Sequence, residues 1–181
     1  MANDRFVVIA NQYDSEADAL ADFEDVRKLY DELGIFDTYD AAVLTRKADG
    51  QVEIVKSAAG PTRQGAALGL FGGLALGAAL ALFPAITVAG GLLAGGTLGA
   101  GAGAIAGHMV SGMSRSDLKD LGELLDNGTS GLVVVVESVV QARVEATIKR
   151  AKRQAKAPVQ ADVDAMKKEL APLQGKSDDA H

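Results

Sequence analysis

The chain has 181 residues, a net charge of −6 and no cysteine or tryptophan. This length suits one ordinary domain with an appendage better than two full-sized domains. The lack of cysteine excludes a disulfide framework, a thiol nucleophile and a thiolate metal site, and it indicates a reducing compartment such as the cytoplasm. An acidic chain with 4% aromatic residues also argues against nucleic acid as a partner, because that partner needs a basic surface with stacking side chains.

The first predicted elements are a strand and a helix. Residues 5–10 form a short apolar run rich in β-branched side chains, which predicts a strand. Ser15 followed by Asp18 is typical of a helix N-cap, apolar residues then recur every three or four positions, and Gly34 suits a C-cap. We therefore predict a helix that ends at Leu33.

The other face of this helix is acidic. We expect these side chains to be solvated, and recruitment of a basic partner or weak binding of divalent cations is the alternative. The acidic residues are Glu16, Asp18, Asp22, Glu24, Asp25, Asp31 and Glu32.

Further along, Asp49-Gly50 lies between two strand-like runs, residues 41–47 and 51–57, and predicts a β-hairpin turn. Ser114 starts a second capped helix with a leucine stripe, and residues 132–136 form the most strand-like run of all. The order strand, helix, strand, strand, helix, strand is that of a ferredoxin-like α+β sandwich, with an antiparallel sheet and helices on one face. We assign residues 4–60 and 114–137 to this split domain.

Residues 138–172 are predicted to form an extra C-terminal helix, basic and amphipathic, that ends at Pro158, followed by a short polar helix. Residues 173–181 are expected to be a disordered tail. A cationic amphipathic helix near a membrane attracts anionic lipid, so we consider lipid contact and simple solvation as equal alternatives. The basic residues concerned are Arg143, Lys149, Arg150, Lys152, Arg153 and Lys156.

Residues 61–113 are predicted to be an inserted apolar helical hairpin. No charged residue occurs from Gln64 to Met113, and Pro84 would form the hairpin tip between arms of about twenty and twenty-five residues, each long enough to cross the bilayer core. Glycines recur every fourth residue on both arms, in the pattern of a glycine zipper. They are Gly65, Gly69, Gly73 and Gly77 on the first arm and Gly91, Gly95, Gly99, Gly103 and Gly107 on the second.

These glycines predict helix packing and self-association. A glycine inside a helix costs about 1 kcal/mol relative to alanine, so helices with this many glycines need a compensating contact. Aligned small residues allow two helix backbones to approach closely, as in GxxxG packing. We infer that the arms pack on each other or on copies of themselves.

Three settings remain open for the hairpin: a two-pass span, a re-entrant hairpin in one leaflet, and a hairpin buried in a soluble oligomer. The second arm is weakly apolar, and the tip has no charge and no anchoring Trp or Tyr. Both features make a full membrane span energetically less favourable. Basic residues flank the hairpin on both sides, which would keep both ends cytoplasmic, although ordinary surface charges explain them nearly as well.

The sequence offers no catalytic residue, no cofactor site, no metal site and no identifiable small-molecule substrate. Residues 99–104 match a loose dinucleotide fingerprint, but no strand precedes them and they belong to the glycine pattern. His108 and His181 are isolated from carboxylates at ligand spacing. His108 is better explained as the place where the second arm reaches solvent than as a pH-sensitive latch.

Taken together, the acidic first helix, the Ala41-Ala-Val-Leu strand, Asp49-Gly50, the glycine-rich arms and Leu132–Val136 resemble a bacterial family known as domain of unknown function 1269. The resemblance covers roughly residues 4 to 156. Its members look like membrane proteins and are similar in outline to heat-induced general stress proteins. The resemblance implies a stress-linked, membrane-associated protein and no catalytic residues.

We therefore expect a non-enzymatic, membrane-associated stress protein on the cytoplasmic side of the bacterial inner membrane. It would form homo-oligomers through the glycine zipper and could remodel or protect the membrane. The alternative is a soluble cytoplasmic scaffold or compartment component, whose hairpins form a shared apolar core. A third possibility, a ferredoxin-like domain that senses a small ligand, would need a polar pocket that the sequence cannot show.

Overall fold

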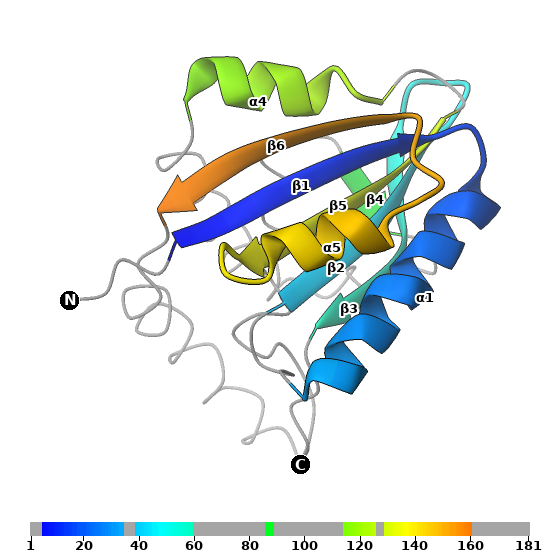
Figure 1. The fold of residues 1–181 in the computed structure, drawn as a ribbon. Helices are drawn as coiled ribbons and strands as arrows, with labels where there is room; N and C mark the ends of the chain where they lie inside the picture. The colour runs from blue at the N-terminus through cyan, green and yellow to red at the C-terminus, as the bar shows by residue number, and fades with distance from the viewer. Residues whose placement is uncertain (1–4, 35–38, 60–85, 89–113, 126–128, 161–181) are drawn as a thin grey trace, which may run out of the picture.

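The computed structural model describes residues 5–34, 39–59, 86–88, 114–125 and 129–160 (Figure 1). Their helices and strands, in chain order, are β1 (Arg5–Tyr13), α1 (Glu16–Leu33), β2 (Tyr39–Arg46), β3 (Val52–Ala59), β4 (Ile86–Val88), α4 (Arg115–Gly122), β5 (Ser130–Glu137), α5 (Gln141–Thr147) and β6 (Arg153–Gln160).

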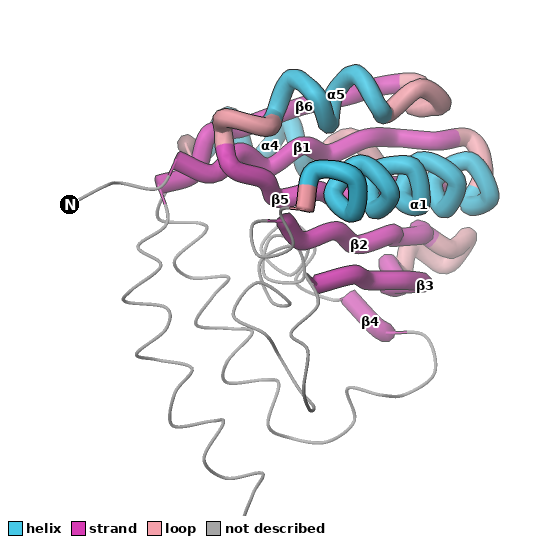
Figure 2. The backbone as a smooth tube through the Cα atoms, turned by 60° about the horizontal axis from the view of Figure 1, so that its bottom comes forward, coloured by secondary structure: helices cyan, strands magenta, loops and turns pink. Residues whose placement is uncertain are grey.

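The strands form one sheet in the order β4-β3-β2-β5-β1-β6. The five strands from β3 to β6 pair antiparallel, and only β4 joins its neighbour β3 in parallel. Figure 2 shows α1 and α5 on the same face of this sheet. The predicted α+β class with an antiparallel sheet is therefore confirmed.

The ends of α1 agree with the predicted caps. The Ser15 hydroxyl accepts a hydrogen bond from the backbone N–H of Asp18 at 3.2 Å and donates one to its carboxylate at 2.8 Å. At the other end, Gly34 has a φ of 64°, in the left-handed region where glycine is the least strained residue. Local sequence is thus sufficient to set both ends of this helix.

The predicted hairpin turn also agrees with the structure. Gly50 has a φ of 84°, and its backbone N–H donates to the carbonyl of Lys47 at 2.9 Å. The N–H of Lys47 donates to the carbonyl of Gln51 at 2.8 Å and closes the loop between β2 and β3. The register between β2 and β3 shifts once, between Val43 and Leu44.

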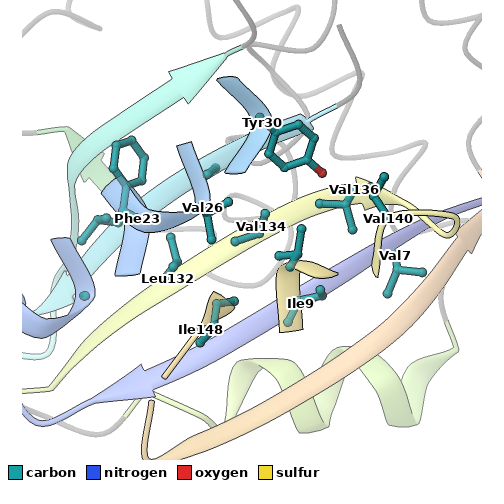
Figure 3. Packing of buried hydrophobic residues seen from close by; sticks show 14 of the residues in the cluster. Val7, Ile9, Phe23, Val26, Tyr30, Leu132, Val134, Val136, Val140 and Ile148 are labelled. Carbon is teal, nitrogen blue, oxygen red and sulfur yellow. The ribbon is translucent and has the colours of Figure 1, made fainter. Parts of the chain in front are cut away.

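The main core lies between the sheet and the two helices of that face. Alternate residues of the central strands, among them Ile9 and Val134, face Phe23, Val26 and other side chains of α1, and α5 adds its own apolar residues (Figure 3). Burial of one such side chain contributes about 1.5–3 kcal/mol. This core explains why the apolar residues of α1 recur with helical spacing.

The opposite face of the sheet is buried as well. Val133 and Val135 of β5 are 3% and 1% exposed, so this central strand is covered on both faces and is apolar at successive positions. Leu125, three residues beyond α4, lies over Gly131 on this second face: a Cβ added at Gly131 would be 2.8 Å from its Cδ2 atom. The predicted second helix and the strand at residues 132–136 are both present, as α4 and β5.

The predicted basic helix is wrong beyond Thr147. α5 ends there, and Arg153–Gln160 form β6, which pairs with β1 along its whole length. Pro158 does not end a helix but lies within this strand, opposite Val7. Proline lacks an N–H donor, and β6 is the last strand in the sheet order, where that donor is dispensable. Residues 153–160, expected outside the split domain, thus belong to the same sheet, and α5 packs on it.

The predicted second arm is wrong at its first residues. Ile86–Val88, just beyond Pro84, are not helical but form β4 beside β3. The sequence Ile-Thr-Val is β-branched throughout and suits a strand better than a helix. Other predicted segments, including the short polar helix, the residue 173–181 tail and the rest of both arms, lie outside the described residues.

Candidate functional site

The strongest polar cluster joins α1 to the loop between α5 and β6, and Asp22 is its centre. The Asp22 side chain is fully buried. Its Oδ2 atom accepts hydrogen bonds from the Tyr13 hydroxyl at 3.1 Å and from the backbone N–H groups of Lys149 and Arg150 at 3.1 and 2.9 Å. Its Oδ1 atom accepts one from Nη1 of Arg150 at 2.5 Å. Four donors thus replace the water that a carboxylate loses on burial.

Arg150 links two carboxylates of α1. The same Nη1 atom that contacts Asp22 donates to Oδ2 of Asp25 at 2.9 Å. This hydrogen bond lowers the pKa of Asp25, and the bonds to Asp25 and Asp22 together raise the pKa of Arg150. Burial raises the pKa of Tyr13 strongly, and the neighbouring charge of Asp22 raises it further. The cluster therefore favours the charged form of Asp25 and the neutral form of Tyr13.

Two more cations of the predicted lipid-contact set pair with acids of the same chain. Nζ of Lys152 lies 3.3 Å from Oδ2 of Asp14, and Nζ of Lys156 lies 2.9 Å from Oε1 of Glu145. A hydrogen bond from Gln141 and then the contact with Lys156 lower the pKa of Glu145. Exposed pairs of this kind contribute little to stability, typically ~0.2–1 kcal/mol each, but they reduce the charge available to a partner.

The remaining three cations of the set are Arg143, Lys149 and Arg153. All three are exposed. Within the described part of the chain, none of their side chains forms an ion pair. Three of the six predicted cations are thus exposed and have no ion pair among the described residues.

A second cluster joins α1 to β3. Nζ of Lys56 lies 2.5 Å from Oε1 of Glu24 and 5.1 Å from the centre of the Phe23 ring. Nη2 of Arg27 lies 2.8 Å from Oε2 of Glu24. The hydrogen bond from Lys56 is the main cause that lowers the pKa of Glu24. The acidic helix thus meets basic groups of its own chain at two places.

The prediction that the acidic face is solvated is wrong for Asp22. Ala19, Asp22, Phe23, Val26 and Tyr30 are all buried along α1, and their spacing of three and four residues places Asp22 within the apolar stripe. This spacing was a signal that the sequence contained. The partner, Arg150, was out of reach of any local pattern because 128 residues separate the two.

The other predicted site residues lie outside the described residues. These are all nine glycines of the two arms, Pro84 at the tip, and both histidines. None of the helices in the described ranges is long and apolar enough to cross a membrane. Within the same ranges, no group of three or more His, Cys, Asp or Glu side chains could hold a metal ion.

The described residues thus define an α+β protein with an antiparallel sheet and an ionic contact between its acidic helix and its basic C-terminal loop. Residues 66–171, more than half of the chain, match the family described as protein of unknown function (DUF1269), and the chain belongs to this family. The predicted family is confirmed, but the match begins within the glycine-rich segment and extends beyond β6. No curated protein and no solved structure matches the chain.

Proposed function

We propose that this protein is a non-enzymatic, membrane-associated stress protein that forms homo-oligomers through the glycine-rich arms and remodels or protects the bilayer. The observation that carries the proposal is the uncharged stretch from Gln64 to Met113, in which glycines recur every fourth residue. A segment of this length without a charge suits hydrocarbon, and its glycine ridges suit close helix packing. The cytoplasmic side of the bacterial inner membrane is the proposed location.

The exposed cations Arg143, Lys149 and Arg153 support the same proposal. They lie on α5, on the following loop and at the start of β6, and they are free to contact anionic lipid. Each basic residue near an anionic membrane surface gains about 1 kcal/mol. Under this proposal they orient the α+β domain on the lipid surface, while Arg150, Lys152 and Lys156 are paired with acids of the same chain.

We also propose that the α+β domain is ferredoxin-like, with β1, α1, β2, β5, α5 and β6 as its βαββαβ unit. The strand order β2-β5-β1-β6 supports this assignment, because β5 separates the parallel strands β1 and β2, and β1 separates the parallel strands β5 and β6. In this assignment β3, β4 and α4 are insertions. The second helix and fourth strand are then α5 and β6 instead of the segments expected from sequence.

Fractionation and light scattering test the proposed function. The protein should remain in membranes after an alkaline carbonate wash, and size-exclusion chromatography with light scattering should detect a detergent-bound oligomer. Gly73→Leu and Gly99→Leu should dissociate it, because a leucine side chain separates the helix backbones. Ala146→Leu, at an exposed position of α5 outside the arms, is the matched control. A monodisperse protein purified without detergent would exclude the bilayer setting, and an unchanged oligomer in the leucine variants would exclude the glycine ridges as the contact.

One observation favours the alternative, a soluble scaffold or compartment component. Ile86–Val88 pair with the outer edge of β3, so this part of the glycine-rich segment lies against the α+β sheet. In a soluble assembly the arms would be covered by other copies rather than by lipid. This alternative predicts a large particle that forms without detergent and is dissociated by the same leucine substitutions.

A further inference from the structure

The contact between β4 and β3 bears directly on the proposed membrane association. Val52, Glu53 and Ile54 of β3 pair in parallel with Ile86, Thr87 and Val88 of β4. Ile86–Val88 follow Pro84, which the sequence predicts to be the tip of the glycine-rich hairpin. The residues next to the tip therefore lie on the sheet.

Strand geometry shows how far back the chain must return. β3 runs from Val52 to Ala59, about 23 Å at a rise of roughly 3.3 Å per residue. The chain leaves this strand at Ala59, yet Ile86 pairs with Val52 at the opposite end. Ile86–Val88 thus lie beside the start of β3.

The residues at and before the start of β3 are exposed and include charged side chains. The turn from Lys47 to Gln51 precedes it and is exposed to solvent. Lys47 forms a salt bridge with Glu53, which raises the pKa of Lys47. A site with exposed charges cannot enter hydrocarbon.

A hairpin inserted in a bilayer would carry its tip away from this site. Two arms that cross the hydrocarbon core would place Pro84 roughly 30 Å from the surface on which the α+β domain lies. Ile86–Val88 cannot occupy that position and pair with Val52–Ile54 at the same time. The two arrangements are mutually exclusive.

We propose that the outer edge of β3 at Val52–Ile54 is a docking site for the chain's own Ile86–Val88, and that this docking competes with insertion of the glycine-rich segment into lipid. The inference rests on the proposed membrane association. Among the described residues the pairing is three residues long, shorter than a typical strand of five or six, so a lipid surface can displace it. Docking then keeps Ile86–Val88 paired with β3 until lipid takes up the glycine-rich segment.

A disulfide lock tests the competition. The chain has no cysteine, so the double variant Glu53→Cys/Thr87→Cys contains only the intended pair, at positions that face each other in the β3–β4 register. The matched control is Thr45→Cys/Glu53→Cys, which shares one substitution and links β2 to β3, also at facing positions. Each full-length variant is purified in mild detergent, oxidised, and diluted below the critical micelle concentration with vesicles of phosphatidylethanolamine and phosphatidylglycerol. Flotation after a carbonate wash measures insertion.

We expect the oxidised Glu53→Cys/Thr87→Cys variant to lose insertion by about tenfold or more, because the covalent bond removes the undocked state. A reducing agent should restore it, and the control should insert equally in both states. Vesicles added before the oxidant should slow disulfide formation between residues 53 and 87 but not between residues 45 and 53.

Equal insertion of the oxidised and reduced lock would overturn the proposal, and so would failure of residues 53 and 87 to form a disulfide in buffer. A wild-type chain that never inserts would refute the proposed membrane association and, with it, the competition. That result is distinguishable from the first two because it appears without any substitution.

Discussion

Replacement of Asp22 by alanine should destabilise the domain by about 3 kcal/mol. The substitution removes four hydrogen bonds to one carboxylate, and bonds to charged groups contribute roughly 1.5–3 kcal/mol each but are not additive. Arg150 is 41% exposed and keeps Asp25, so water and this second acid compensate part of its loss. The Tyr13 hydroxyl is fully buried and would lose its acceptor. A loss of this size is a large fraction of the roughly 5–15 kcal/mol that stabilises a domain.

Two measurements on the full chain in mild detergent check this prediction. Pulse proteolysis over a urea series gives the free energy of unfolding, and hydrogen exchange reports on the backbone N–H groups of Lys149 and Arg150, which should exchange faster in the variant. Asp31→Ala is the matched control, since Asp31 is an exposed acid on the same helix and should change stability by less than about 0.5 kcal/mol. A loss below about 1 kcal/mol with unchanged exchange at both amides would refute the anchoring role of Asp22.

Substitutions at three further positions probe the pH dependence, the packing and the backbone strain. Folding raises the pKa of Tyr13 above its ordinary value of 10, so the stability due to its neutral form is present below pH 10 and is lost as the pH rises further, by at most about 1.4 kcal/mol per pH unit. In urea titrations Tyr13→Phe should be less stable than wild type at pH 8, and this deficit should shrink above pH 10; a constant difference would contradict the assignment. Gly131→Ala should cost about 1–3 kcal/mol because its Cβ would lie 2.8 Å from Leu125 and 3.3 Å from the Asn11 carbonyl oxygen, and a neutral result in thermal unfolding would show that Leu125 moves freely. Gly34→Ala should lower stability by about 1 kcal/mol at its positive φ, and Gly34→Asn by less; equal losses would argue against backbone strain as the cause.

Elements with a local signal could be predicted from the sequence. α1 has a cap at each end and an apolar stripe between them, and the β2–β3 turn has a glycine at positive φ. In both cases the deciding interaction is between residues close in the sequence. The family could also be predicted, although its match covers residues 66–171 and leaves out α1 and the β2–β3 turn.

β6 was missed because its strand character depends on a distant partner. Ala155, Ala157 and Val159 alternate with the exposed Lys156 and Pro158, a pattern that suits an edge strand, but Arg153 and Lys156 are also spaced as on a helix. Pairing with β1, about 150 residues earlier in the chain, decides between the two. β4 was missed for a different reason, since its three β-branched residues lie within a long apolar stretch whose glycine spacing dominated the prediction.

The burial of Asp22 shows the same limit for the ionic site. Helical spacing places this carboxylate on the apolar side of α1, but an isolated buried charge is unfavourable, so a solvated position was the reasonable expectation. Arg150 and two backbone N–H groups reverse that balance only after α5 and β6 have brought the loop to α1. The groups that pair with Asp22 therefore reach it only in the folded chain, and the local sequence does not reveal them.

The ion pairs of the basic segment also limit how strongly the protein could bind a membrane surface. Six unpaired cations would supply roughly 6 kcal/mol of attraction to anionic lipid. Because Arg150, Lys152 and Lys156 are paired with acids, only about 3 kcal/mol remains. This remaining attraction raises the affinity for lipid by about a hundredfold. Surface attraction of that size is screened by salt. Under the proposed function, stable association must therefore come from the uncharged segment between Gln64 and Met113. Retention on vesicles in high salt separates the two contributions: release would assign the binding to Arg143, Lys149 and Arg153, and persistence would assign it to the glycine-rich arms.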